Sequence, residues 1–241
     1  MYLPIYVIST KWFVDRHIHM NALADSMGFD FEFIKEFDAD ELTADELEQV
    51  GKGLAPRSAS NVLKHIEAQK KFLNSGADVA LILEDDVILF ENFLSDLKLV
   101  LDRTICLEPG WLIFLGGADN KRDDRFFETN ELSLIEQPLS TAEAYLIDRP
   151  GALKRMEWLK LNKPDRQADH QLKLIDELIS IRQYCVSHAM ATQGSITGKF
   201  STTLDSSRAK HSSLFLRTKY EFNRLRRQTM PRMLRMVTRF W

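Results

Sequence analysis

The sequence predicts an α/β fold, a Rossmann-like and mostly parallel sheet flanked by helices. Short aliphatic runs alternate with stretches of helical periodicity from the N-terminus onward. One run, residues 79–83, is apolar throughout, which is typical of a strand buried on both faces of a parallel sheet. With 241 residues, of which 44% are hydrophobic, the chain can bury a sizeable core. These observations favour one α/β domain, or one domain plus an appendage, and exclude a disordered chain.

The first elements form a strand, a helix and a strand. Residues 4–9 are an apolar, β-branched run that predicts the first strand, and the helical stretch after it ends at Gly28. Residues 29–37 alternate phenylalanine with other side chains and predict the second strand. The acidic stretch 38–50 fits one or two helical turns capped by Thr43. This order predicts a βαβ unit.

The later elements follow the same alternation. They are a helix at 58–74 stopped by Gly76, a helix at 93–101, a strand at 110–117, a polar excursion at 121–136, a strand at 144–148 and a helix at 150–161. The strand at 110–117 ends in two glycines, where we expect a ligand to approach the backbone. The polar excursion predicts a substrate loop or lid. Four apolar residues of the last helix are expected in the core: Leu153, Met156, Trp158 and Leu159.

Three consecutive acids, Glu84, Asp85 and Asp86, follow the apolar run at 79–83. Carboxylates at the end of such a strand point into the crevice where open α/β sheets bind ligands. Neighbouring like charges are costly unless a cation neutralises them, and Mg²⁺ or Mn²⁺ is usually held by one or two carboxylates with substrate phosphates. The acids therefore predict a divalent metal and a phosphate-bearing substrate. The alternative is a solvated turn with nothing bound.

Composition restricts the cellular context. Two cysteines, Cys106 and Cys185, cannot build a disulfide framework and suit a reducing cytosol. The N-terminus lacks the features of a signal peptide, and no apolar stretch approaches the length of a membrane span. We expect a cytoplasmic protein, unless a partner carries it elsewhere.

Charge divides the chain into a domain at 1–205 and a basic tail at 206–241. The tail has ten Lys or Arg residues and one acid, Glu221, whereas the rest has a net charge of −12. Residues 230–241 place apolar side chains on one helical face and arginines on the opposite face. This pattern predicts an interfacial helix on an anionic membrane, at the inner face of the cytoplasmic membrane. The alternatives are packing on the acidic body or on a dimer partner.

Four ordered stretches resemble glycosyltransferase family 25, which includes bacterial lipooligosaccharide galactosyltransferases. They are residues 81–87 preceded by Lys64 and His65, residues 144–148 with Gly151 and Ala152, residues 168–171, and residues 193–195 with 198–201. The order and spacing, from about residue 3 to 204, are more specific than any single piece. In one departure, residues 57–65 keep the final His of a family run and little else.

The resemblance implies a GT-A type fold, a UDP-galactose or UDP-glucose donor and a lipooligosaccharide or lipopolysaccharide acceptor sugar. It makes the acids a DXD-like motif for Mn²⁺ or Mg²⁺. Asp86 is then the direct metal ligand, Glu84 a ligand or a ribose contact, and Asp85 a further donor contact. Gln193 and Ser195 are expected at the donor diphosphate or metal, although Gln-Gly-Ser is also a common turn.

A general base must accept the proton of the acceptor hydroxyl. Asp169 is the first candidate, with His170 placed to orient it, and Glu143 is the reserve. The alternative for Asp169 is that it caps a helix starting at Gln171. His65 lies on an otherwise apolar helix face, where a histidine is more often a core residue than a ligand.

Two other function classes are alternatives to sugar transfer. A nucleic-acid-binding module would use the basic tail, but the tail's aromatic residues lie on an amphipathic face rather than on a base-stacking platform, so we expect no nucleic-acid partner. A metal-dependent phosphotransferase would use the same acids, but the chain lacks a Gly-x-x-x-x-Gly-Lys loop.

Overall fold

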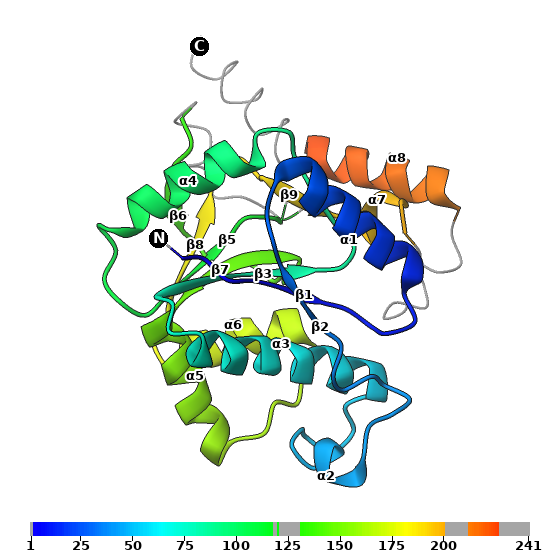
Figure 1. The fold of residues 1–241 in the computed structure, drawn as a ribbon, viewed down its shortest axis with the longest axis vertical. Coiled ribbons are helices and arrows are strands. Elements are labelled where there is room, and N and C mark those ends of the chain that lie inside the picture. The colour runs from blue at the N-terminus through cyan, green and yellow to red at the C-terminus, as the bar shows by residue number, and fades with distance from the viewer. Residues whose placement is uncertain (1, 118–119, 121–130, 201–211, 227–241) are drawn as a thin grey trace.

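A seven-stranded sheet forms the centre of the molecule (Figure 1), which is a computed structural model. The structure describes residues 2–117, 120, 131–200 and 212–226. In spatial order the strands are β2 (Glu32–Ile34), β1 (Ile5–Ile8), β3 (Val79–Glu84), β7 (Ala144–Asp148), β5 (Trp111–Phe114), β8 (Arg182–Val186) and β6 (Leu134–Glu136). A separate ribbon pairs β4 (Val87–Leu89) with β9 (Ala191–Gln193).

Five strands of the sheet run in one direction. β2, β1 and β3 pair in parallel, as do β5 and β8, whereas β7 lies antiparallel between β3 and β5, and β6 is an antiparallel edge. The predicted α/β fold with a Rossmann-like, mostly parallel sheet is confirmed. The ends of β1 and β3 meet at one edge of the sheet, with Ile8 paired to Glu84.

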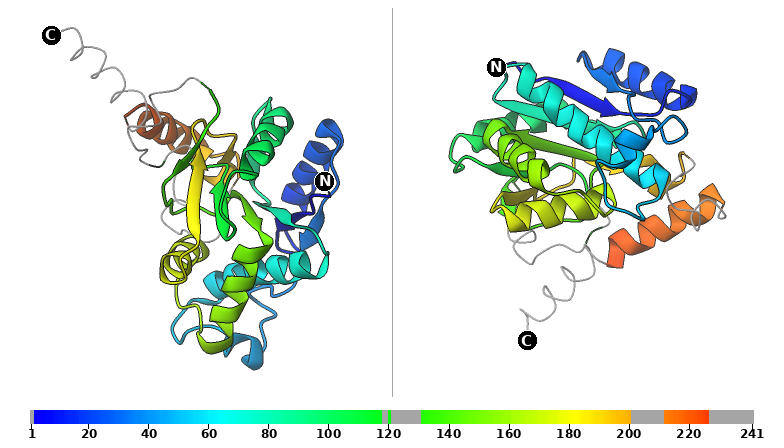
Figure 2. Two further views of the ribbon diagram at one scale, coloured as in Figure 1. Left: turned by 90° about the vertical axis from the view of Figure 1, so that its left-hand side faces the viewer. Right: turned by 90° about the horizontal axis from the view of Figure 1, so that it is seen from below.

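Helices cover both faces of the sheet (Figures 1 and 2). α1 (Val14–Met27) and α4 (Phe93–Thr104) lie on one face. α3 (Pro56–Asn74), α5 (Arg149–Leu161) and α6 (Ala168–Leu178) lie on the other face. Short α2 (Ala44–Leu47) precedes α3, while α7 (Gly194–Thr197) follows β9 and packs against α8 (Ser213–Arg224).

The apolar run of β3 is buried from both sides. Leu81 and Leu83 point into the core beneath α1 and α4, and Ala80 and Ile82 point into the core shared with α3, α5 and α6. All four side chains are fully buried. This alternation explains why the strand is apolar at every position until Glu84, since no face of it meets water.

Local signals placed several elements correctly. Gly28 ends α1 in the left-handed conformation, with φ of 74°, and donates its backbone N–H to Ala24 O. Thr43 caps α2, and its side chain and that of Glu46 form the reciprocal hydrogen bonds of a capping box. Asp148 caps α5 by accepting a hydrogen bond from the Gly151 N–H.

Three details differ from the sequence expectations. β2 covers only Glu32–Ile34 of the predicted strand at 29–37, and Phe37, which was expected at its end, lies in the left-handed region with φ of 64°. Part of the predicted lid at 121–136 is edge strand β6, whereas residues 121–130 lie outside the described residues. Leu153 is exposed, and α5 buries Gly151, Ala152 and Arg155 instead.

The predicted tail is described only in part. α8 buries Leu216 and Tyr220, whereas its other apolar side chains, Leu214, Phe215 and Phe222, are exposed, as is Leu225 directly after the helix. The interfacial helix predicted at 230–241 lies outside the described residues. No helix that the structure describes combines the length and the apolar composition required to cross a membrane.

Candidate active site

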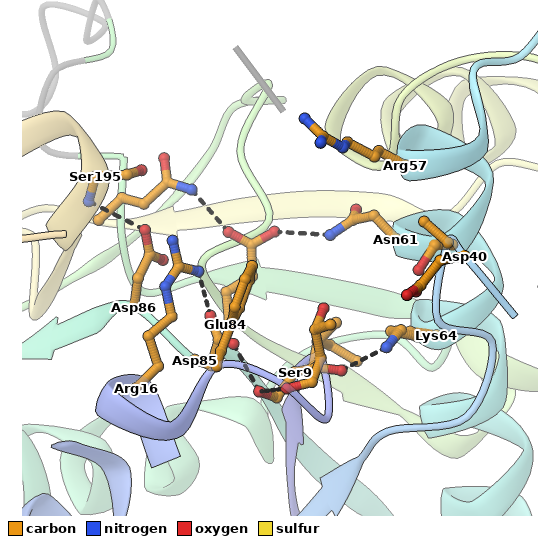
Figure 3. Close-up of a pocket in the computed structure, with 16 residues that line it drawn as sticks. Ser9, Arg16, Asp40, Arg57, Asn61, Lys64, Glu84, Asp85, Asp86 and Ser195 are labelled. Atoms are coloured by element: carbon orange, nitrogen blue, oxygen red, sulfur yellow. Dashed lines mark hydrogen bonds and ion pairs between the residues drawn. The ribbon is translucent and has the colours of Figure 1, made fainter. Parts of the chain in front are cut away.

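A cavity of about 330 Å³ opens where β1 and β3 end (Figure 3). Residues far apart in the sequence line it. They come from the end of β1 and the start of α1 (Ile8, Ser9, Thr10, Phe13, Arg16), from the segment before α3 (Ala39, Asp40), from α3 (Arg57, Ser60, Asn61, Lys64), from the acidic turn (Glu84, Asp85, Asp86) and from the β9–α7 junction (Gln193, Ser195). The cavity therefore contains the three acids together with Gln193 and Ser195.

Glu84 is held from two sides. Its Oε2 accepts a hydrogen bond of 2.8 Å from Gln193 Nε2, and its Oε1 lies 3.4 Å from Asn61 Nδ2 and 3.8 Å from His65 Nε2. Its backbone N–H donates to the backbone oxygen of Glu143, the residue directly before neighbouring β7. Burial acts to raise the pKa of Glu84, but interaction with His65 and Asn61 outweighs it, so the pKa is lowered and the carboxylate favours its charged form.

Asp85 is engaged on both carboxylate oxygens. Oδ1 forms an ion pair of 2.5 Å with Arg16, and Oδ2 accepts a hydrogen bond of 2.6 Å from the Ser9 hydroxyl. Burial nevertheless raises the pKa of this carboxyl. The main geometric consequence is that Asp85 holds the Arg16 guanidinium at the cavity wall (Figure 3).

Asp86 joins the acidic turn to the β9–α7 junction. Its backbone oxygen accepts from the Gly194 N–H at 2.7 Å, and its Oδ2 accepts from the Ser195 N–H at 3.0 Å. The other carboxylate oxygen, Oδ1, is buried and accepts no hydrogen bond from any described residue. Burial, reinforced by the charges of Glu84 and Asp85, raises the pKa of Asp86 to about 6.

The acids suit a hard divalent cation that is completed by a substrate. Asp86 offers a buried carboxylate oxygen with no hydrogen-bond donor among the described residues, and Glu84 carries a second carboxylate in the same cavity. Within the described ranges, no three His, Cys, Asp or Glu side chains are arranged to hold a metal. Two carboxylates with phosphate oxygens and water are the usual set for Mg²⁺ in nucleotide sites. The residues therefore fit the predicted cation when a diphosphate is also bound.

Several cavity residues were missed by the sequence reading. Arg57, Asn61 and Lys64 lie on the first turns of α3 and Arg16 on α1, opposite one another across the acids (Figure 3). Lys64 is buried, forms an ion pair with Asp38, and donates to Ser9 O at 2.5 Å. The signal was their spacing, because positions 57, 61 and 64 share one helical face directly before the acidic strand.

The two candidate bases lie outside the cavity lining. Asp169 is half-buried in the first turn of α6, and its Oδ1 accepts a hydrogen bond from the next residue's N–H, that of His170. The alternative that Asp169 caps a helix starting at Gln171 is wrong, because α6 begins at Ala168. Since α6 leads into parallel strand β8, its N-terminal turn lies at the same edge of the sheet as the acids.

Glu143 is paired with Glu84 through its backbone oxygen, and its side chain is buried. Its carboxylate accepts a hydrogen bond from the Gly117 N–H and occupies the space that a side chain at Gly116 would need. The two glycines after β5 were expected to admit a ligand. In the structure they admit the Glu143 carboxylate.

One protein family matches most of the sequence. The family described as glycosyltransferase family 25 (LPS biosynthesis protein) matches residues 2–193. No curated protein is similar enough in sequence to be matched with the chain.

Solved structures with a related shape have little sequence in common with this chain. The galactosyltransferase LgtC, solved with donor and acceptor sugar analogs, has 10% identity and a TM-score of 0.44 over 97% of this chain and 99% of its own. A glycosyltransferase involved in glycosylation of the major capsid of PBCV-1 has 12% identity and a TM-score of 0.41, over 91% and 99%. A197 from STIV has 12% identity and a TM-score of 0.41, over 77% and 81%.

Proposed function

The chain belongs to glycosyltransferase family 25, and from this premise we propose that it transfers galactose or glucose from a UDP-sugar to a sugar of lipooligosaccharide or lipopolysaccharide. Family membership supports sugar transfer in LPS biosynthesis. The donor, the acceptor and the dependence on Mn²⁺ or Mg²⁺ are our proposals. The observation that carries them is the pair of carboxylates, Glu84 and Asp86, in a cavity that also presents Arg16 and Arg57.

Different cavity residues would hold different parts of the donor and its cation. Glu84 and Asp86 would hold the cation, which neutralises charge on the leaving diphosphate when it is bound. Gln193 and Ser195 lie beside these carboxylates and would contact the diphosphate or the cation. Asp85, already bound to Arg16 and Ser9, would contribute by keeping the Arg16 guanidinium toward the phosphates.

Transfer forms a bond between the acceptor hydroxyl oxygen and the anomeric carbon while the bond from that carbon to the diphosphate oxygen breaks. UDP leaves with the bonding electron pair, and the acceptor proton passes to a carboxylate. Asp169 is our first choice of base, because it is half-exposed at the edge of the sheet where the acids lie. Glu143 remains the reserve, since its carboxylate is already bonded to the Gly117 N–H.

A panel of UDP-sugars assayed for UDP release, with Mn²⁺ and with a chelator, tests the proposal. We expect one hexose donor to be turned over with metal, and the chelator or Asp86→Asn to reduce turnover by at least about a hundredfold. Release of inorganic phosphate in place of UDP would favour a phosphotransferase instead. No turnover with any donor, or full activity in Asp86→Asn, would reject the mechanism.

Membrane attachment is a separate part of the proposal. The exposed face of α8 carries Phe215 and Phe222 beside the exposed Lys219, and the exposed Arg226 follows the helix. This combination supports contact with an anionic lipid surface. We expect the protein to sediment with vesicles containing anionic lipid at low salt, but not with neutral vesicles. The double variant Phe215→Ser/Phe222→Ser should bind less, and equal binding by both proteins would count against α8 as the contact.

A further inference from the structure

His65 lies directly behind Glu84 and is enclosed by polar groups. It is 2% exposed, its Nδ1 is 3.0 Å from the Tyr145 hydroxyl, and its ring stacks on the Tyr145 ring with centroids 5.8 Å apart. Its Nε2 faces Glu84 Oε1 at 3.8 Å and has no hydrogen-bond partner among the described residues. One ring nitrogen is therefore bonded, and the other points at a proposed cation ligand.

The groups around His65 determine which ring nitrogen carries its proton. Glu84 Oε1 faces Nε2, and because a carboxylate can only accept hydrogen bonds, it favours a proton on that nitrogen. In a neutral ring Nδ1 then has no proton and accepts from the Tyr145 hydroxyl. Behind Tyr145, the Arg155 guanidinium interacts electrostatically with the phenol and is fixed by two bonds to Asp176, of 2.7 and 2.6 Å.

A hydrogen bond accepted by Nδ1 fixes the tautomer of a neutral imidazole. The ring proton must then be on Nε2, which faces Glu84. The distance of 3.8 Å exceeds a normal hydrogen bond, and a small movement of the carboxylate toward His65 would close it. Such contacts often tighten only when a site is loaded.

We propose that His65 is a positioning residue, which Tyr145 holds as the Nε2–H tautomer so that it directs the Glu84 carboxylate toward the bound cation. The proposal rests on the role of Glu84 put forward above and adds a chain of buried groups behind it, from Asp176 through Arg155 and Tyr145 to His65. Groups of this kind orient metal ligands, and their removal commonly reduces metal affinity by 10- to 100-fold.

The tautomer is measured directly by long-range ¹H–¹⁵N correlation spectra of the histidine rings, with His65→Gln used to assign the His65 signals. We expect the Nε2–H pattern in the protein without added metal and its loss or mixing in Tyr145→Phe. A wild-type Nδ1–H pattern, or an unchanged pattern in Tyr145→Phe, would overturn the proposal whether or not the protein binds metal.

Mn²⁺ binding in the presence of UDP, measured by calorimetry, tests the consequence. His65→Asn removes the donor near Glu84 and should weaken Mn²⁺ binding by about tenfold. His65→Gln can place an amide N–H near the position of Nε2 and should stay within about threefold of the wild type. Tyr184→Phe, a buried tyrosine elsewhere in the sheet, is the matched control and should bind normally.

The outcomes separate this inference from the proposed function. Normal Mn²⁺ binding by the wild type and equally by His65→Asn would overturn the role of His65 and leave the cation site standing. No Mn²⁺ binding by the wild type would reject both. If His65→Asn does not fold, Tyr145→Phe and the ring spectra still decide.

Discussion

Asp86 occupies a position that suits cation binding but is unfavourable for a charged carboxylate when no cation is bound. Its carboxylate is buried beside two other acids, and Oδ1 receives no hydrogen bond from the described residues. Without a cation, the charged form is therefore disfavoured, which is why the pKa of Asp86 is raised to about 6. An ordinary structural aspartate would not be kept in this state, so the cost is consistent with a ligand-binding role.

Asp86→Asn should stabilise the protein when no cation is present. Below pH 4, Asp86 is protonated in both the folded and the unfolded protein, and its contribution to stability is fully present. Because its pKa is raised in the folded protein, this contribution is lost as pH rises through about 6. The amide removes the buried charge but keeps an oxygen for the Ser195 N–H. At pH 7 in chelator we expect the free energy of unfolding to rise by about 1 to 2 kcal/mol.

Urea unfolding at pH 7 and pH 4 measures the effect. The difference between Asp86→Asn and the wild type should shrink at pH 4, and added Mn²⁺ should stabilise only the wild type. A variant that is less stable than the wild type at pH 7 in chelator would contradict this account of the buried charge.

At the scale of the element, the β9–α7 junction is bonded directly to two of the acids, Glu84 and Asp86. Gly194 donates its N–H to Asp86 O, and a Cβ at this position would lie 2.6 Å from that oxygen and 2.6 Å from the Phe200 ring. Neither backbone nor ring can move away without shifting the junction. The glycine therefore sets how closely Ser195 approaches Asp86.

Gly194→Ala should damage the site more than it damages the fold. Crowding of this kind costs about 1 to 3 kcal/mol, and it separates Asp86 from the Ser195 N–H. We expect the KM for the donor to rise about tenfold, if the enzyme uses these residues as proposed. Steady-state kinetics and thermal unfolding of the same preparation measure the two effects.

The matched control is Gly28→Ala, where a Cβ meets no atom within 4 Å but φ is +74°. It should lose about 1 kcal/mol of stability from the left-handed backbone and keep its KM. Equal KM values in the two variants would show that the junction does not position the donor site.

Sequence patterns predicted where helices and strands lie along the chain better than they predicted which strands pair. Aliphatic runs and stop signals located most helices and strands, because local periodicity and capping determine them. The antiparallel insertion of β7 and the edge strand β6 were not predicted, since pairing depends on contacts between distant segments. The same limit applies to the site: Gln193 was expected near the acids only through the family resemblance, and Arg16 and Asn61 were not expected at all.

At the scale of the whole molecule, one buried ion pair joins three elements on the α3 side of the sheet. Arg155 of α5 and Asp176 of α6 are each 1% exposed and form a two-bond contact, and Gln183 of β8 donates to Asp176 at 2.7 Å. Charges buried this deeply are tolerable only as a pair. The pair also fixes α6, on which Asp169 lies.

Asp176→Asn should be among the most destabilising single substitutions in the protein. It leaves the Arg155 charge buried without its counter-ion, for which the usual cost is 3 to 5 kcal/mol. The exposed pair between Arg182 and Glu136, with side chains 47% and 48% exposed, provides the comparison. Glu136→Gln should change the free energy of unfolding by less than about 1 kcal/mol. Urea unfolding measures both changes. If Asp176→Asn and Glu136→Gln lowered the free energy of unfolding by similar amounts, the buried pair would not stabilise the protein more than the exposed pair.

Side-chain alternation in β9 has a consequence for changes in chain length. Gln193 faces the acids, whereas the adjacent Thr192 faces a second groove of about 590 Å³ beside α8. Because strand side chains alternate, a one-residue slip of β9 against β4 would exchange the two. Homologues and engineered variants should therefore tolerate substitutions in this ribbon more readily than single insertions or deletions, which would turn the glutamine away from Glu84 while leaving the main sheet intact.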